Sequence, residues 1–525
     1  MLVATGLLAA LGLAASAAHP PARADAPRPR LVVLIAVDQL RGDYIPRFAP
    51  QLEGGLARFW REGAFFEQGR QDHAITETAP GHSTMLSGRW PAHTGIVTNL
   101  LGVGDPDAPL LEVKDAGQGA SPRRFHGTTL YDWLRAADSG SRVLSVSRKD
   151  RGAILPVGRS RGDVYWFDSG IFTTSTWYRN QDTLPGWVRQ FNGRDPVRAL
   201  AGWTWSLLLP DSAYPEPDSV RFEAAGAGVI FPHRLSPNPE AAVLQIAAFP
   251  VMDSLTLAFA LYGVERMRLG RGPATDLLVI SLSTTDAVGH AYGPDSRELH
   301  DQVLRVDRWL GGFMDSLAVL VPREATVWAL TGDHGVTSLP ELAVEQGRKA
   351  GRVWFGDLVR QVEQLTAGNA PFAFETGLLF GDVNRLRGAG VNVDSVASAL
   401  AARAAAVPGV AEVFTPKTLR AAPATDSGAV LWRRTIPDDF PWLLCATLEP
   451  GYVWSPGRVI AEHGTTSVND QWVPVAFLGS GIAARHYTVP VSTTDIGPTL
   501  AKLAGVRPTE RLDGRVLAQV LAKAR

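Results

Sequence analysis

Three near-continuous apolar runs in the chain each stop at, or shortly before, an aspartate. They are LVVLIAV before Asp38, LLVISLS before Asp286 and TVWALTG before Asp333. Runs of this kind are typical of parallel strands that are buried on both faces. Sites in open α/β sheets form outside the carboxyl ends of the strands, so we expect the three aspartates to meet in one crevice.

Helical patterns fill the gaps between these runs. One apolar stripe recurs at intervals of three and four residues and comprises Leu299, Val303, Val306, Leu310, Phe313 and Leu317. Another helix is expected in TTDIGPTLAKLAGV, closed by Gly505. Pro80 lies near the start of a third expected helix. The free N–H groups of this helix would point at any group bound to Thr78. The pattern predicts an α/β protein, a three-layer sandwich with a largely parallel central sheet flanked by helices.

Two further regions interrupt this pattern. Residues 158–272 contain several tryptophans and proline-rich turns, and residues 341–450 include SVASALAARAAAVPGVAEVF, a helix followed by a strand. We interpret the first as a Trp-rich accessory insertion and the second as an α/β insertion, because the chain must return to the same site at His463. We expect the tryptophans to pack in the core rather than bind a ligand. The sheet domain is then left with residues 31–157, 273–340 and 451–525.

Residues 1–24 are expected to be a signal peptide. The stretch MLVATGLLAALGLAASAA has no charged side chain and ends in small residues, and its apolar core is too short to span a bilayer. We therefore expect a periplasmic or secreted protein whose mature form has no membrane span. Cys445 is the only cysteine and lies in an apolar run, so we expect it to be buried and not disulfide-bonded.

Composition narrows the range of partners. The 525 residues are 45% hydrophobic and 20% charged, which is typical of globular proteins. The formal net charge of −1 gives no reason to expect binding to a nucleic acid scaffold, so any attraction for phosphate must be local. The sequence leaves the oligomeric state open, and a monomer is compatible with it.

Six potential metal ligands follow the apolar runs: Asp38, Asp286, His290, Asp333, His334 and His463. Three carboxylates and three imidazoles can hold two divalent transition ions. Two such ions can bind both the attacking and the leaving oxygen of a phosphoryl transfer. Thr78, between the first two ligands in the sequence, could be the nucleophile. Imidazole ligands favour zinc, although oxygen-rich sets also accept manganese.

The order of these residues resembles that of the alkaline phosphatase superfamily. The segment TETAPGHSTMLSGRWPAHTGIVTN, which holds Thr78 and Asn99, is similar to the nucleophile segment of one branch. That branch contains the nucleotide pyrophosphatase/phosphodiesterases and the threonine-using, PafA-type alkaline phosphatases. TTDIGPTLAKLAG and LDGRVL also resemble C-terminal patterns of the superfamily. The resemblance covers about residues 31–155 and 275–520 and implies that the sheet domain is an alkaline-phosphatase-like catalytic domain.

The resemblance also implies a role for each ligand. One zinc ion would bind the leaving oxygen and be held by Asp286, His290 and His463. The other would bind the Thr78 oxygen and be held by Asp38, Asp333 and His334. Thr78 would attack phosphorus in line and form a covalent phosphothreonine, which is then hydrolysed.

The segment SVSRKDRGAILPVGR bears on the substrate. Lys149 and Arg151 lie two residues apart and are expected on the same side of an extended stretch. Two cations suit the dianion of a monoester better than the monoanion of a diester. KDRGAILP is similar to the stretch through which PafA-type monoesterases contact phosphate, and Asn99 would donate a further hydrogen bond. Arg148 has no such role and is expected to be solvated.

We therefore predict a secreted, zinc-dependent hydrolase of small-molecule phosphate monoesters, an alkaline phosphatase. A phosphodiesterase or nucleotide pyrophosphatase with the same metal site is the alternative, because the Trp-rich insertion could hold a second ester group. A sulfatase needs Cys or Ser followed by x-Pro-x-Arg, whereas Thr78 is followed by APGH. A non-catalytic binding protein on this fold would lack a ligand or the nucleophile, and neither defect is seen in the sequence.

Overall fold

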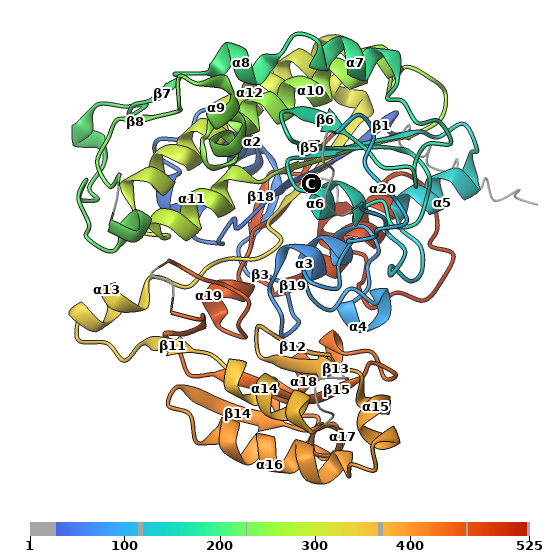
Figure 1. The fold of residues 1–525 in the computed structure, drawn as a ribbon. Coiled ribbons are helices and arrows are strands. Elements are labelled where there is room, and N and C mark those ends of the chain that lie inside the picture. Colours follow the sequence, from blue (N-terminus) through green and yellow to red (C-terminus); the bar gives the residue numbers. More distant parts are fainter. Residues whose placement is uncertain (1–27, 114–118, 227, 366–370, 458–459, 522–525) are drawn as a thin grey trace, which may run out of the picture.

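A computed structural model describes residues 28–113, 119–226, 228–365, 371–457 and 460–521 (Figure 1). At its centre is a sheet with the strand order β18-β2-β17-β10-β1-β9-β4-β5-β6. The strands are β1 (Leu31–Val37), β2 (Ala64–Phe66), β4 (Val143–Ser147), β5 (Asp163–Asp168), β6 (Ile171–Thr173), β9 (Asp276–Leu282), β10 (Thr326–Thr331), β17 (Val475–Gly479) and β18 (Arg485–Tyr487). The predicted signal peptide, residues 1–24, lies outside the described residues.

The middle of this sheet is parallel. β10, β1, β9, β4 and β5 pair in parallel, whereas β17 is antiparallel to β10 and β2, and β6 is antiparallel to β5. Every residue of β1, β9 and β10 is buried, and these strands coincide with the three apolar runs. The prediction of a largely parallel central sheet is confirmed.

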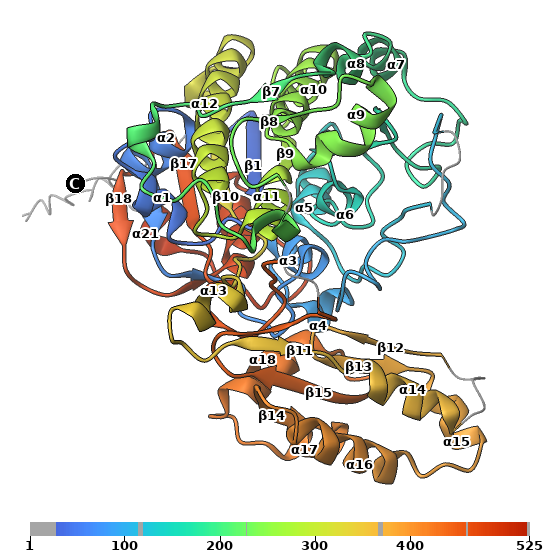
Figure 2. The same cartoon turned by 60° about the vertical axis from the view of Figure 1, so that its left-hand side comes forward.

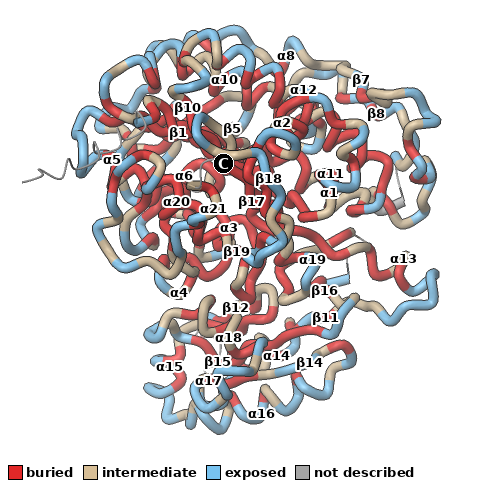
Figure 3. The backbone as a smooth tube through the Cα atoms, turned by 180° about the vertical axis from the view of Figure 1, so that it is seen from behind, coloured by how far each residue is buried: buried red, intermediate tan, exposed pale blue. Residues whose placement is uncertain are grey.

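Helices cover both faces of the sheet, as a three-layer sandwich requires, and Figure 3 shows the central strands buried inside the exposed outer surface. In β1, Val33 and Ile35 pack into one apolar cluster, and Val32 and Leu34 pack into another on the opposite face. The first cluster contains side chains of α1 (Tyr44–Phe48), α2 (Gly55–Glu62), α10 (Val251–Met267), α11 (Thr284–Tyr292) and α12 (Arg297–Leu320). The second contains side chains of α3 (Thr78–Met85), α5 (Leu130–Ala137), α6 (Asp150–Ile154) and α20 (Ile496–Leu503).

The region 158–272 is joined to the sheet more closely than predicted. β5 and β6 extend the central sheet, and α10 packs against β4 and β9, so the predicted start of the insertion is too early. Its other elements are α7 (Gly186–Asn192), α8 (Pro196–Leu200), β7 (Thr204–Trp205), η1 (Asp211–Ala213), η2 (Glu223–Gly226), β8 (His233–Arg234), α9 (Pro239–Gln245) and η3 (Ile246–Ala248). Trp166 and Trp205 are fully buried, in keeping with a packing role.

A second, smaller body lies below the central sheet in Figure 2. Its antiparallel sheet has the order β12-β13-β15-β14, with β12 (Phe372–Glu375), β13 (Leu378–Gly381), β14 (Val410–Phe414) and β15 (Trp442–Leu448). Its helices are α14 (Gly356–Gln364), α15 (Val383–Gly388), α16 (Val393–Ala405), α17 (Pro416–Ala421) and α18 (Ser427–Thr435). The helix and strand predicted in this region are α16 and β14. Cys445 is buried in β15, as expected.

Short elements complete the described chain. They are β3 (Gly69–Arg70), α4 (Pro91–Thr94), η4 (Arg323–Ala325), α13 (Pro340–Glu345), β11 (Gly351–Val353), β16 (Tyr452–Trp454), α19 (Val468–Gln471), β19 (Val491–Ser492), η5 (Thr493–Asp495) and α21 (Ala518–Leu521). Among the described residues, no single helix has both the length and the apolar composition needed to cross a membrane. One pair, Pro239–Ala248 with Val251–Met267, meets these criteria only when taken together across a 92° bend.

Candidate two-metal active site

The three aspartates meet at the carboxyl ends of the central strands, as predicted. Asp38 directly follows β1, and Asp333 follows β10 after one glycine. Asp286 lies in the first turn of α11, which begins just after β9. All three are buried, and their side chains come together because the parallel order of β10, β1 and β9 aligns the ends of these strands.

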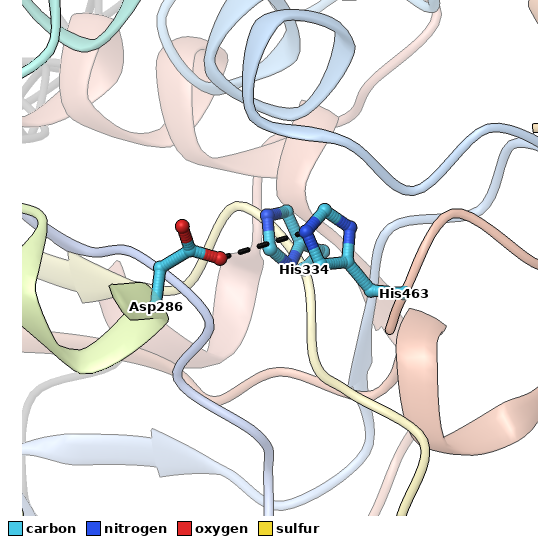
Figure 4. Close-up of side chains that lie close together, drawn as sticks. All are labelled: Asp286, His334 and His463. Atoms are coloured by element: carbon cyan, nitrogen blue, oxygen red, sulfur yellow. Dashed lines mark ion pairs between the residues drawn. The ribbon is translucent and has the colours of Figure 1, made fainter. Parts of the chain in front are cut away.

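The three histidines approach the aspartates from different segments. His290 lies one turn after Asp286 on α11, and His334 follows the end of β10. His463 comes from the loop between β16 and α19. Figure 4 shows His463 beside His334, with Asp286 facing both. The rings of His334 and His463 are stacked with their centroids 3.6 Å apart.

Backbone carbonyls orient all three rings in the same way. Nδ1 of His290, His334 and His463 lies 2.6–2.9 Å from the carbonyl oxygens of Ala461, Gly335 and Thr76, respectively. A ring that donates its Nδ1 proton to a carbonyl presents a lone pair at Nε2. Each of the three Nε2 atoms lies near a carboxylate oxygen, which is also an acceptor.

The ligand atoms form two overlapping groups. Within 4.8 Å of one another lie those of Asp286, His334 and His463, and likewise those of Asp38, Asp333 and His334. The second group is the trio predicted for one zinc ion. His290 Nε2 joins the first group, 3.2 Å from Asp286 Oδ1 and 3.2 Å from His463 Nε2. The structure therefore brings together all six predicted ligands, with His334 shared by the two groups.

Buried polar atoms that have close charged or titratable neighbours, but no well-formed hydrogen bond within the described residues, mark the same place. They are both carboxylate oxygens of Asp38, Oδ2 of Asp333 and Nε2 of His334. Burial raises the pKa of Asp38, and the charges of Asp286 and Asp333 raise it further. Buried acceptors and like charges at such close range are stabilised by cations. Three carboxylates and three imidazole nitrogens therefore fit two divalent ions that accept mixed oxygen and nitrogen ligands.

The nucleophile candidate Thr78 is the first residue of α3 and is buried. One turn later, a Cβ built on Gly81 would lie 2.2 Å from the carbonyl oxygen of Asp333. Only glycine permits such a close approach, which fixes the amino end of α3 against the ligand-bearing end of β10. The helix predicted after Thr78 is confirmed, and its amino end lies at the site.

Lys149 lies inside the site. Its Nζ is 2.5 Å from Asp38 Oδ2, 2.6 Å from Asp286 Oδ2 and 3.2 Å from Thr78 Oγ1. Burial favours the neutral form of Asp286, but the Lys149 ammonium and His290 outweigh this effect and hold the pKa of Asp286 well below its usual range. The ammonium therefore bridges two candidate ligands and the candidate nucleophile.

Lys149 and Arg151 do not share an extended stretch, and this prediction is wrong. The chain turns into α6 at Asp150, so Lys149 is the last extended residue and Arg151 is already helical. The Arg151 side chain is partly exposed, and its Nε is buried without a hydrogen-bond partner. Both cations nevertheless line one cavity of about 210 Å³, together with Arg148.

Asn99 is oriented by the start of α3. Its Oδ1 accepts a hydrogen bond of 2.8 Å from the backbone N–H of Ala79. Because a backbone N–H can only donate, this contact assigns the oxygen of the side-chain amide to that side. The Nδ2 group is then directed elsewhere and can donate to a substrate oxygen.

One polar neighbour of the ligands, Gln39, was not singled out from the sequence. Gln39 donates from its backbone N–H to Asp333 and from Nε2 to Asp286, at 3.0 and 2.9 Å, and its φ of 62° is unusual for a residue other than glycine. The one feature of the sequence that could have indicated Gln39 is its position directly after Asp38. His82 also contacts a ligand, with Nδ1 3.1 Å from Asp333 Oδ2.

Glu77, directly before Thr78, was also missed. Its carboxylate accepts from the Asn99 backbone N–H at 2.8 Å and from the Thr376 hydroxyl at 2.9 Å. Burial raises the pKa of Glu77 to about 8, and the charge of Glu375 adds to this effect. Because Glu375 and Thr376 lie at the turn between β12 and β13, the second body reaches the start of the nucleophile helix.

Known proteins resemble the chain along most of its length. Residues 32–353 match the family model described as type I phosphodiesterase / nucleotide pyrophosphatase. The chain is 28% identical to alkaline phosphatase PafA of Elizabethkingia meningoseptica, over 95% of each protein. It is 30% identical to alkaline phosphatase PhoV of Synechococcus elongatus, over 94% of the chain and 93% of the relative. A crystal structure of wild-type PafA superposes with a TM-score of 0.87 at 27% identity and covers 94% of this chain and 99% of its own.

Proposed function

The chain belongs to the type I phosphodiesterase / nucleotide pyrophosphatase family, and from this premise we propose that it hydrolyses phosphate monoesters at a two-zinc site through a phosphothreonine at Thr78. The broader assignment, an alkaline phosphatase, is supported by relatives of that name that match almost the full chain. The phosphothreonine and the identity of the metal are proposals, carried by the geometry of the site.

The observation that carries the proposal is the position of the Thr78 hydroxyl. Thr78 lies at the amino end of α3, and its Oγ1 is 3.2 Å from an ammonium that contacts two candidate metal ligands. A hydroxyl is a weak nucleophile unless its proton is removed or its oxygen is bound by a cation. The surroundings of Thr78 supply that stabilisation, together with the positive dipole end of the helix.

The residues of the chain have separate tasks in this reaction. The six ligands would hold two divalent ions, which supply Lewis acidity that lowers the pKa of the attacking hydroxyl and stabilises negative charge on the leaving oxygen. Thr78 Oγ1 attacks phosphorus, and the bond to the leaving alcohol breaks. Water then cleaves the phosphothreonine and restores the hydroxyl. During both steps, the amide of Asn99 donates a hydrogen bond to an outer phosphate oxygen. The cations Lys149 and Arg151 neutralise the charge of the outer oxygens.

Specificity for monoesters rests on the second cation. A monoester dianion carries one more negative charge than a diester, and Lys149 and Arg151 line the same cavity. In a diester, an uncharged substituent would replace one of the anionic phosphate oxygens that the cations bind. The buried Arg151 Nε would then have no phosphate oxygen to pair with. We also propose that residues 1–24 direct export, so that the enzyme acts in the periplasm or outside the cell.

The test compares two aryl substrates on purified protein loaded with zinc. We expect kcat/KM for 4-nitrophenyl phosphate to exceed that for its methyl diester, and Thr78→Ala to reduce the monoester value at least about a thousandfold. Thr78→Ser, which keeps a hydroxyl, is the matched control and should retain much of the activity. A preference for the diester would favour the phosphodiesterase alternative. Unchanged activity of Thr78→Ala would exclude the covalent mechanism.

A further inference from the structure

The Arg148 side chain is partly exposed. Its Nε is buried without a hydrogen-bond partner, and within the described ranges its guanidinium makes neither a hydrogen bond nor an ion pair. The positive charge of Arg148 favours the ionised form of the nearby Asp253, but the Asp253 carboxylate accepts its hydrogen bonds from Thr284 and Gln302 and not from Arg148. A buried N–H donor of this kind has a free-energy cost unless a hydrogen-bond acceptor pairs with it.

Arg148 lines a cavity of about 380 Å³ beside the active site. The insertion supplies most of the wall: Arg234 from β8, Leu244 from α9 and Phe249 just after η3. Ala287 of α11 also lines the cavity. The volume suits a small organic group, and the lining combines apolar side chains with two arginines. Arg234 is exposed and, like Arg148, forms no side-chain ion pair within the part of the chain that the structure describes.

Two lining residues of this cavity are sequence neighbours of residues in the proposed active site. Ala287 directly follows Asp286, whose carboxylate belongs to the group assigned to the leaving oxygen. Arg148 directly precedes Lys149 and also lines the 210 Å³ cavity that contains Lys149 and Arg151. Arg148 thus borders both the cavity that contains the two proposed phosphate-binding cations and the larger cavity.

We infer that this cavity is a leaving-group subsite for phosphate monoesters whose alcohol carries a second anionic group, such as an organic bisphosphate. The inference rests on the proposed function. The second anion would pair with Arg148 and Arg234, which have no carboxylate partner among the described residues. The carbon skeleton would pack against Leu244 and Phe249. Arginine is suited to this task because its planar fork binds phosphate oxygens in pairs.

The test uses two aryl phosphates with similar leaving-group acidity, 4-methylphenyl phosphate and 4-(phosphonomethyl)phenyl phosphate, of which the second carries a non-hydrolysable dianion. For wild-type enzyme we expect kcat/KM to be about three- to tenfold higher for the phosphonate substrate at low salt. Arg148→Ala and Arg234→Ala should each bring this ratio towards one. The ratio is internally controlled, because a folding defect lowers both values together.

Arg198→Ala is the control, because Arg198 lies on α8 of the same insertion, is 66% exposed and pairs with Asp195. It should leave the ratio as in wild type. A wild-type ratio at or below one, or a raised ratio that survives in both cavity variants, would overturn the subsite while leaving the phosphatase assignment intact. Failure to hydrolyse either substrate would instead contradict the proposed function.

Discussion

At the residue scale, the position of one ring proton decides what each histidine of the site can bind. His290, His334 and His463 each place Nδ1 against a backbone carbonyl, so Nε2 is the nitrogen left to face the aspartates. Burial lowers the pKa of His463 to about 3. Burial also disfavours the charged forms of His290 and His334, but neighbouring carboxylates outweigh it: Asp286 raises the pKa of His290, and Asp333 raises that of His334 to about 9. A neutral ring with a free Nε2 lone pair is the form that binds a metal ion.

Glu223 gives a residue-scale prediction that does not depend on the active site. It is buried in the insertion, and its Oε2 has no hydrogen-bond partner. Burial raises its pKa to about 8, and the charge of Glu298 contributes. The folded state therefore binds this proton more tightly than the unfolded state. The resulting stability is complete below about pH 4, the ordinary range of glutamate, and is lost as the pH rises to 8.

We therefore expect Glu223→Gln to raise Tm relative to wild type at about pH 9 and to raise it less, or lower it, at about pH 5. Thermal unfolding of both proteins at the two pH values measures the difference. Glu265→Gln, an exposed position on α10, should show no such pH-dependent change. Equal Tm shifts for Glu223→Gln at both pH values would contradict the burial argument.

At the element scale, the site depends on how closely α3 packs against the end of β10. The sequence indicated the strands, because their apolar runs stop at the aspartates, and it indicated α12 through its apolar stripe. It did not reveal that Gly81 touches the backbone of Asp333, because glycine spacing in one segment says nothing about a segment far away in sequence. β5 was missed because its DVYWFD sequence is neither continuously apolar nor strictly alternating.

Substitution of Gly81 tests this packing. The Cβ added by Gly81→Ala would meet Asp333 backbone atoms that cannot move without shifting a candidate ligand. We expect denaturant unfolding to show a loss of about 1–3 kcal/mol in the free energy of unfolding. The phosphatase assay should show that kcat/KM falls by a larger factor than the fraction of folded protein. Gly312→Ala on α12, where a Cβ would meet nothing within 4 Å, should instead be neutral or stabilising. A Gly81→Ala enzyme with wild-type activity would show that this contact is not needed.

At the scale of the whole molecule, segments from the first strand to a loop near the C-terminus converge on one site. The residue types and their placement after apolar runs were enough to predict Asp38, Asp286 and Asp333 together. The supporting contacts of Glu77 could not be predicted, because Thr376 reaches it from a separate sheet. Nor could the position of Arg148 in the cavity of about 380 Å³, which depends on how the insertion packs against α11.

The most direct test of the account is the metal content of the purified protein, measured together with its activity. We predict about two zinc ions per chain, loss of phosphatase activity when a chelator removes them and recovery when zinc is returned. Asp333→Ala and His463→Ala should each bind less zinc than wild type. A protein stripped of divalent metal that still hydrolyses phosphate monoesters at the wild-type rate would contradict the two-metal site.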